Sequence, residues 1–346
     1  MPKRASMSDV ARVAGVSLTT ASRALNGVGR VSAETRARVI ETAERLQFQP
    51  DMLARSFVTG RSFIVGVLAE SARGRFSMPL IMGATNYLGR ENIAAVTLDA
   101  RGTPRILNDY LKRLRARRID GLLVVGDDPN RASLVLSEDF AVPVVFASSS
   151  ATPETDYVVA PDNRGAGRAA AEYLIGLGRR NIAHVTAAVH DPAVDARVDG
   201  FTEAMRSAGM PIAMGGPLYG SYLQRWGTAA GERILDSMAG GQPVDAIFAA
   251  NDEIAIGLFA AFHRHGVRVP DDIAIVGYDN RLAGVMRPDH PLSTFDPDLS
   301  TVGERAAERL LQAIGGTTTP GIHYVQPTFV EGRSTIGPTL EPYDIL

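Results

Sequence analysis

The apolar residues of this chain follow two patterns, one before Phe63 and another after it. From Phe63 onward, short apolar runs alternate with segments of helical periodicity, which predicts parallel strands covered by helices on both faces. A single sheet holding all of these strands would be too wide for its connections, so we expect two lobes. The predicted strands are FIVGVLA (63–69), IAAVTLD (93–99), GLLVVG (121–126), VPVVFAS (142–148), NIAHVTA (181–187), DAIFAA (245–250) and DIAIVGYD (272–279).

The segment before Phe63 predicts three short helices. Ser8 and Asp9 are placed to cap a helix over VARVA, and Gly15 should end it, because glycine takes the positive φ of a tight turn. Ser17 can cap a second helix over LTTASRALN, and Ser32 a third. Two short helices joined at Gly15 predict a helix-turn-helix, in which the second helix enters the major groove of DNA.

The predicted second helix carries side chains suited to reading DNA, among them Leu18, Thr19, Ser22 and Arg23. An arginine can make a bidentate contact with guanine, whereas a leucine can meet only apolar groups such as the thymine methyl. The helical spacing alone is equally compatible with any small helical bundle.

The composition of the chain excludes several classes of protein. A chain of 346 residues suggests two or three domains, and the absence of cysteine excludes disulfides, thiolate nucleophiles and cysteine-ligated zinc. No run reaches the roughly 18 to 20 apolar residues that span a bilayer, and the N-terminus lacks the apolar stretch of a signal peptide. We therefore expect a cytoplasmic protein without a membrane partner.

Charge is distributed unevenly. Up to Arg61 the chain has ten basic and five acidic residues, a net charge of +5; since the total is −2, the remainder carries −7. A basic head on an acidic body is typical of a polyanion-binding module joined to another domain, although chance asymmetry of a solvated surface is the alternative.

The order of residues in the head adds a family resemblance. DVARVAGVSLTTASRALN, followed by VS at 31–32 and TRARV at 35–39, resembles the headpiece of the lactose-repressor (LacI/GalR) family. The resemblance covers almost the whole chain. It implies an N-terminal all-α helix-turn-helix headpiece plus an α/β two-lobed, periplasmic-binding-protein-like effector domain with parallel sheets. It also implies operator DNA, a second copy of the chain and a small sugar-like effector as partners, with no cofactor, metal or enzymatic activity.

The resemblance divides the chain into a headpiece (1–49), a hinge helix and linker (50–61), a two-lobed effector-binding and dimerisation domain (62–336) and a short tail (337–346), with lobe crossings near 160, 290 and 325. The tail has no heptads, so we expect a dimer.

In the family, paired hinge helices wedge an apolar side chain into the minor groove. Here Phe57 stands where leucine is usual and Asp51 where asparagine is usual; alternatively, Phe57 packs on the effector domain. The DNA-binding residues implied are Ser17, Leu18, Thr19, Thr20, Ser22, Arg23, Asn26, Ala54, Arg55 and Phe57.

For the effector, the resemblance implies a cleft lined by Glu70, Ser71, Phe76, Arg197, Tyr222, Asn251, Asp252 and Asp279. Clefts of parallel α/β sheets lie at the carboxyl ends of strands, and several of these residues follow predicted strands. Structural alternatives remain open: Asn251 and Asp252 as helix caps, Arg197 and Asp279 in surface ion pairs, and Tyr222 and Phe76 in the core. Ser71 replaces the aspartate usual in the family, and Arg73 or Arg75 could instead meet an acidic sugar.

Three other classes of protein fit the sequence less well. Residues 165–170 fit the G-x-G-x-x-A dinucleotide fingerprint, with Asp191 past the next strand, but four residues separate the glycines from strand YVVA. His263 and His265 diverge on a helix and form no metal-ligand spacing. A transporter's solute-binding protein would need export and no DNA-binding head.

Overall fold

The computed structural model describes residues 5–25, 27, 29–48, 56, 59–69, 74, 76–99, 104–126, 142–148, 155–282 and 290–345. Within it the chain divides into two compact units, Met1–Phe63 and Ile64–Leu346, here called the headpiece and the body. None of the described helices is long and apolar enough to cross a membrane.

The headpiece contains three helices: α1 (Met7–Ala14), α2 (Leu18–Leu25) and α3 (Ala33–Arg45). The helix α1 begins earlier than its predicted cap, because Ser6 accepts the N–H of Asp9 while the Asp9 carboxylate accepts the N–H of Ser6. This reciprocal capping box satisfies two donors of the first turn, and the sequence prediction of Ser8 as a cap was wrong. Gly15, at φ 67°, ends the helix as expected.

A small apolar core joins the three helices. Val10, Ala21 and Val39, one from each helix, are fully buried. Two arginines of α3 tie the helices together, since Arg36 donates to the Ala24 carbonyl and Arg38 to the Ala14 carbonyl. They satisfy carbonyls at the ends of α2 and α1 that lack partners within their own helices.

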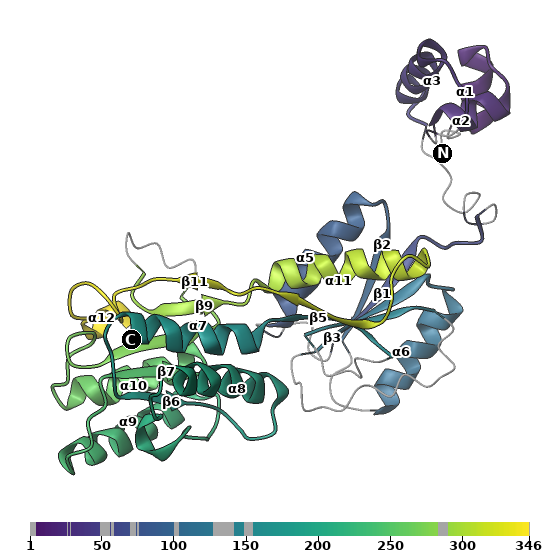
Figure 1. Ribbon diagram of the computed structural model, residues 1–346. Helices are drawn as coiled ribbons and strands as arrows, with labels where there is room; N and C mark the ends of the chain where they lie inside the picture. Colours follow the sequence, from purple (N-terminus) through teal and green to yellow (C-terminus); the bar gives the residue numbers. More distant parts are fainter. Residues whose placement is uncertain are drawn as a thin grey trace. The chain divides into compact units, whose positions relative to one another are not determined.

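The body is built on two sheets, as Figure 1 shows. The first has the order β10-β5-β4-β3-β1-β2 and is entirely parallel; the second has the order β11-β9-β8-β7-β6, with only β11 antiparallel. The strands are β1 (Ile64–Ala69), β2 (Ala94–Asp99), β3 (Gly121–Val125), β4 (Val144–Ala147), β5 (Tyr157–Pro161), β6 (Ile182–Val185), β7 (Ala246–Ala249), β8 (Ala274–Tyr278), β9 (Ser293–Asp296), β10 (Gly321–Val325) and β11 (Thr328–Val330).

Each sheet is the centre of one lobe. The chain passes between the sheets after β5, after β9 and after β10, so it crosses three times. Two of the crossing segments are hydrogen-bonded to each other, because Asp162 donates its N–H to the Val325 carbonyl and its carboxylate accepts from Gln326. The predicted parallel-sheet, two-lobed fold class is confirmed, including all seven strands named from the sequence.

Helices cover both faces of each sheet. In the first lobe α5 and α11 pack together against the sheet, and Leu111 and Leu114 of α6 join the apolar cluster of the sheet's strands. In the second lobe residues of α7 and α8 share one apolar cluster with the sheet, and residues of α9 and α10 share another. The helices are α5 (Ser77–Arg90), α6 (Pro104–Ala116), α7 (Asn163–Gly176), α8 (Pro192–Ser207), α9 (Gln224–Ala239), α10 (Asp252–Arg264), α11 (Leu299–Ile314) and α12 (Pro342–Ile345), with a short 3-10 turn η1 (Ala213–Gly215).

Three helix pairs cross through reciprocal glycines. A Cβ on Gly167 of α7 would overlap the Arg197 carbonyl of α8, and one on Gly200 of α8 would overlap the Arg164 carbonyl of α7. The pairs α5/α11 and α9/α10 cross in the same way. Gly167, which fitted the dinucleotide fingerprint, thus allows two helix backbones to approach closely. Asp162 caps α7 by accepting the N–H of Gly165.

Candidate functional site

The recognition surface of the headpiece is the exposed side of α2. Ser17 caps this helix by accepting the N–H of Thr20, and their hydroxyls are 2.8 Å apart. Leu18 is 53% exposed, and Thr19 and Arg23 are also exposed, while Ala21 and Ala24 on the other side are buried. The helix therefore keeps its small apolar residues for the core and leaves its predicted DNA-reading side chains accessible. Thr20 and Ser22 are half-buried.

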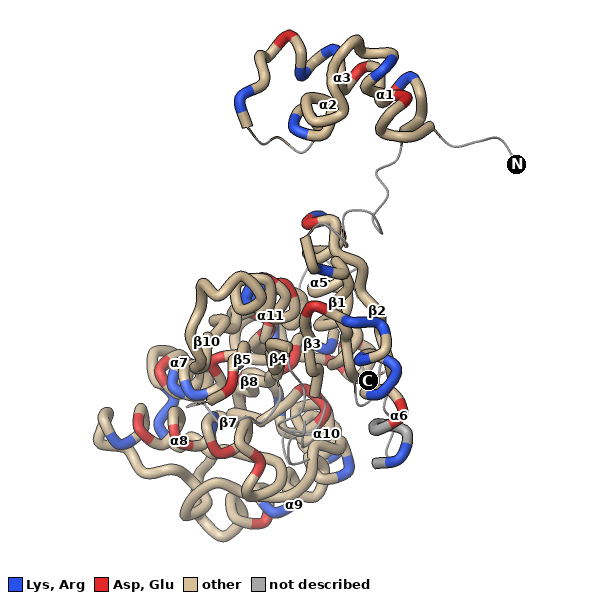
Figure 2. The backbone as a smooth tube through the Cα atoms, turned by 90° about the vertical axis from the view of Figure 1, so that its right-hand side faces the viewer, with Lys and Arg blue, Asp and Glu red and all other residues tan. Residues whose placement is uncertain are grey.

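Gly29 supports Arg23, a role that the sequence reading missed. A Cβ at Gly29 would lie 3.1 Å from Cδ of Arg23, so the arginine stem crosses the glycine backbone, which has φ 75°. Figure 2 shows basic positions on all three headpiece helices. Arg12 belongs to α1, Arg23 to α2 and Arg36 to α3. Asn26, Ala54, Arg55 and Phe57 lie outside the described residues.

The second candidate site lies at the carboxyl ends of the strands in the second lobe. Arg197 of α8 is only 4% exposed; its guanidinium donates to the Asn163 side chain and stacks over the Tyr278 ring at 4.5 Å from the ring centroid. No carboxylate of the described residues forms an ion pair with Arg197, so the surface ion-pair alternative finds no support there. Burial raises the pKa of the Tyr278 hydroxyl, which stays protonated at neutral pH.

Tyr222 is held in place by two hydrogen bonds. Its hydroxyl donates to Asp191 at 2.5 Å, and its carbonyl accepts from the Asn251 side chain at 3.1 Å. Burial raises the pKa of Tyr222; the Asp191 carboxylate and the charge of Asp279 act in the same direction. The side chain is therefore a neutral hydrogen-bond donor, and the residue as a whole is 36% exposed.

Asp191 is a residue that the sequence reading weighed only for a dinucleotide. It is 2% exposed, and its second oxygen accepts the N–H groups of Ala193 and Val194, which caps α8. One carboxylate thus fixes both the helix that carries Arg197 and the tyrosine opposite. The sequence signal for it was aspartate followed by Pro192, a typical start of a helix.

We expect Asp191→Ala to destabilise the body by about 2 kcal/mol, because it removes a helix cap and leaves the Tyr222 hydroxyl without its acceptor. Asp191→Asn, which can still cap α8, should lose less than half as much. Urea denaturation followed by the fluorescence of the single tryptophan, Trp226, measures both variants. Equal stability of Asp191→Ala and the unmodified chain would contradict this role.

Asn251 and Asp252 hold the adjoining loop. Asn251 caps α10 by accepting the N–H of Ile254. Asp252 is completely buried, and its two oxygens accept from the Thr294 hydroxyl at 2.7 Å and the Arg281 N–H at 2.6 Å. These contacts fix the turn that presents Asp279, whose φ is 102°.

A buried histidine, His184, lies close to Arg197. The Nδ1 of His184 faces the Phe248 carbonyl at 2.9 Å, so this nitrogen carries the proton and Nε2 is an acceptor. Burial and, to a lesser extent, the nearby Arg197 cation lower the pKa of His184 to about 4, although the hydrogen bond with the Phe248 carbonyl acts in the opposite direction. His184 is neutral at pH 7. Among the described residues no group of three or more histidine, cysteine, aspartate or glutamate side chains could hold a metal ion.

Of the remaining predicted cleft residues, Phe76 is half-buried and directly precedes α5 in the first lobe. Glu70 and Ser71 lie outside the described residues. The structure therefore brings together Arg197, Tyr222, Asn251 and the turn at Asp279 in the second lobe, and adds Asp191 to them.

Comparisons with known proteins match both units. The profile described as "Bacterial regulatory proteins, lacI family" matches residues 6–51, and the one described as "Periplasmic binding protein-like domain" matches residues 171–335. The chain is 30% identical over 313 residues to the HTH-type transcriptional repressor PurR of Vibrio parahaemolyticus, covering 90% of this chain and 92% of that protein. It is 29% identical over 338 residues to the ribose operon repressor of Escherichia coli, covering 97% and 98%.

Solved structures of transcriptional regulators have a similar fold. The lac repressor dimer bound to operator and the anti-inducer ONPF has a TM-score of 0.69 at 24% identity, covering 97% of this chain and 100% of that one. The complex of the transcriptional regulator CelR with cellobiose has a TM-score of 0.66 at 26% identity, covering 96% and 100%.

Proposed function

The chain belongs to the LacI family of bacterial regulatory proteins, and we propose that it is a repressor whose hold on operator DNA is set by a small, sugar-like effector. It is a transcriptional regulator with a helix-turn-helix DNA-binding domain and an effector-binding domain. The observation that carries the proposal is the exposed face of α2, where Leu18, Thr19 and Arg23 are accessible while Ala21 and Ala24 build the core. The proposal includes no catalytic step.

DNA would be bound by two copies of the chain. One headpiece reads one half-site, so a homodimer requires a near-palindromic operator with two half-sites. An exposed apolar pair on α5 supports a self-association surface: Met78 and Met82 are 44% and 49% exposed, one helical turn apart. The opposite side of this helix is occupied, because Gly83 packs on α11.

The effector would bind at the carboxyl edge of the second sheet. The guanidinium of Arg197 offers several donors in a plane, and the carboxylate of Asp279 can accept from two neighbouring hydroxyls. The Tyr222 ring would pack on the apolar face of a sugar. Asp252, whose oxygens both accept hydrogen bonds within the protein, would act by holding the Asp279 turn.

Regulation would couple two equilibria, closure of the lobes on the effector and pairing of the hinge segments (50–61) on the operator. An effector that favours separated hinge segments would induce transcription, whereas one that favours paired segments would act as a corepressor.

A thermal-shift screen tests the effector class. It should cover neutral mono- and disaccharides, including cellobiose, together with uronates and phosphorylated sugars. A ligand that binds only the folded protein raises the melting temperature, and Trp226 gives a second readout because its ring N–H donates to the Thr186 carbonyl at the edge of this site. If no sugar or sugar derivative changes either signal, a sugar-like effector is excluded; stabilisation by charged sugars alone would favour an acidic one.

A further inference from the structure

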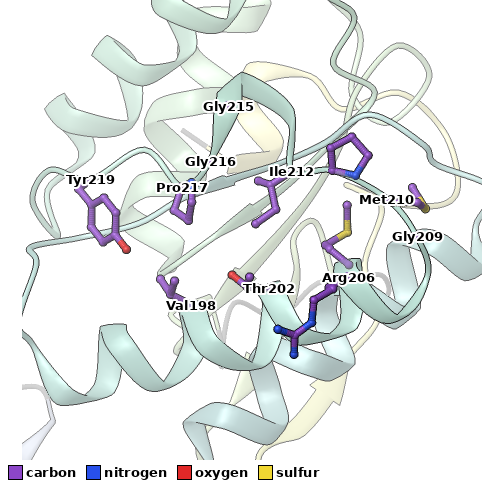
Figure 3. A pocket seen from close by; sticks show the side chains of 12 residues that line it. Val198, Thr202, Arg206, Gly209, Met210, Ile212, Gly215, Gly216, Pro217 and Tyr219 are labelled. Atoms are coloured by element: carbon purple, nitrogen blue, oxygen red, sulfur yellow. The ribbon is translucent and has the colours of Figure 1, made fainter.

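A second concave surface lies on the other side of α8 from the Arg197 site. It is an open groove of about 820 Å³ between α8 and residues 209–219. Figure 3 shows Val198, Thr202 and Arg206 of α8 on one wall and Ile212 and Tyr219 on the other. Val198 follows Arg197 directly, so neighbouring residues of one helix line the two sites.

The outer wall of the groove has a fixed backbone. Residues 209, 214, 215 and 216 all have positive φ, which bends the chain back toward the sheet. Leu218 then pairs with β6: its N–H donates to the His184 carbonyl and its carbonyl accepts from Thr186, both at 2.8 Å. The groove is therefore a built feature of the second lobe.

The floor of the groove is apolar and adaptable. Met205 is 1% exposed and belongs to the core between α8 and the sheet, while Met210 and Ile212 are half-buried beside it. Methionine side chains are flexible and polarisable, so they adjust to apolar groups of different shapes. Such a floor suits an aliphatic or aromatic body.

The two ends of the groove differ in charge. Arg206 is exposed and forms no ion pair among the described residues, whereas the neighbouring Glu203 is already paired with Arg164 and Arg168. The Thr202 hydroxyl lies one helical turn from Arg206. At the other end, burial raises the pKa of Tyr219, and the nearby charges of Asp195 and Asp199 act in the same direction. Asp199 is partly neutralised by an ion pair with Arg164 at 3.4 Å, whereas Asp195 forms no ion pair among the described residues. One end thus offers a cation, and the other lies near the acidic side chain of Asp195.

We propose that this groove binds an apolar monocarboxylate. The carboxylate pairs with Arg206 and accepts a hydrogen bond from Thr202, and the apolar body lies on Met205, Met210 and Ile212. A dicarboxylate of the same length fits poorly, because its second charge would lie at the Tyr219 end, near the charge of Asp195. The site is separate from the proposed sugar site, and its existence does not depend on that assignment.

Calorimetric titration of the full chain with octanoate tests the proposal, with octanol and suberate as ligands that lack the charge or carry a second one. Octanoate should bind saturably and at least about tenfold more tightly than either. Arg206→Gln should weaken octanoate binding about tenfold, the loss of one charge-assisted contact. Arg233→Gln, which removes another exposed arginine from α9, should leave it unchanged.

Unchanged octanoate affinity in Arg206→Gln would overturn the proposal, and so would equal binding of suberate and octanoate. Asp279→Asn separates this groove from the sugar site: octanoate binding that persists in this variant supports the groove, whereas binding lost in it would place octanoate in the sugar site.

Discussion

Specific operator binding should be lost in Arg23→Ala. A bidentate contact between arginine and guanine contributes about 1–3 kcal/mol of discrimination, and a dimer reading two half-sites loses two such contacts. The affinity for the operator should therefore fall by about 2–6 kcal/mol, thirtyfold or more, while binding to random duplex changes little. Gel-shift titrations with operator and random fragments measure both affinities.

The matched control for this change is Arg45→Ala. It removes the same charge from an exposed headpiece position at the end of α3, away from α2, and should weaken operator and random DNA alike. If Arg23→Ala bound the operator as tightly as the unmodified chain does, the orientation of α2 in the groove would be wrong.

The second large effect is expected from Asp279→Asn, which should abolish the response to the effector while leaving operator binding intact. A carboxylate that accepts from two hydroxyls contributes about 1.5–3 kcal/mol per hydrogen bond, so the effector affinity should fall more than a hundredfold. Asparagine also tolerates positive φ, so the turn, where Asp279 has φ 102°, should keep its shape.

Gel shifts over a range of concentrations of the sugar identified by thermal shift measure this response. Asp236→Asn is the control, because it removes an exposed carboxylate from α9. A normal response in Asp279→Asn would remove this residue from the effector site, and a loss of operator binding would show that the variant damages the fold.

Local signals in the sequence were enough for the apolar strands named from it and for the headpiece helices, whereas the short strands β9, β10 and β11 were not predicted. Buried parallel strands are continuous apolar runs, so β3 (GLLVV) and β8 (AIVGY) could be found without knowing their neighbours. Gly15 and Ser32 marked helix boundaries through their own chemistry. Ser6 was missed because its role depends on the reciprocal bond with Asp9.

Contacts between distant residues could not be foreseen. The role of the glycines at the helix crossings becomes clear only when the facing backbone is known. For this reason Gly167, which allows α7 and α8 to pack closely, also fitted a dinucleotide-binding motif. The C-terminal tail lacks periodicity, yet Leu340 and Ile345 pack into the core of the second lobe and Asp344 pairs with Arg333. At the candidate site, the contacts of Asp191 and Asp252 similarly come from segments far away along the chain.

The most direct test of the account is selection of genomic fragments by the purified full chain against random duplex of the same length, with and without candidate sugars. A sugar-responsive repressor should enrich a few fragments with two related half-sites. It should bind them less tightly as salt is raised, and one sugar should change its affinity for them severalfold. Equal retention of genomic and random duplex under every condition would contradict it.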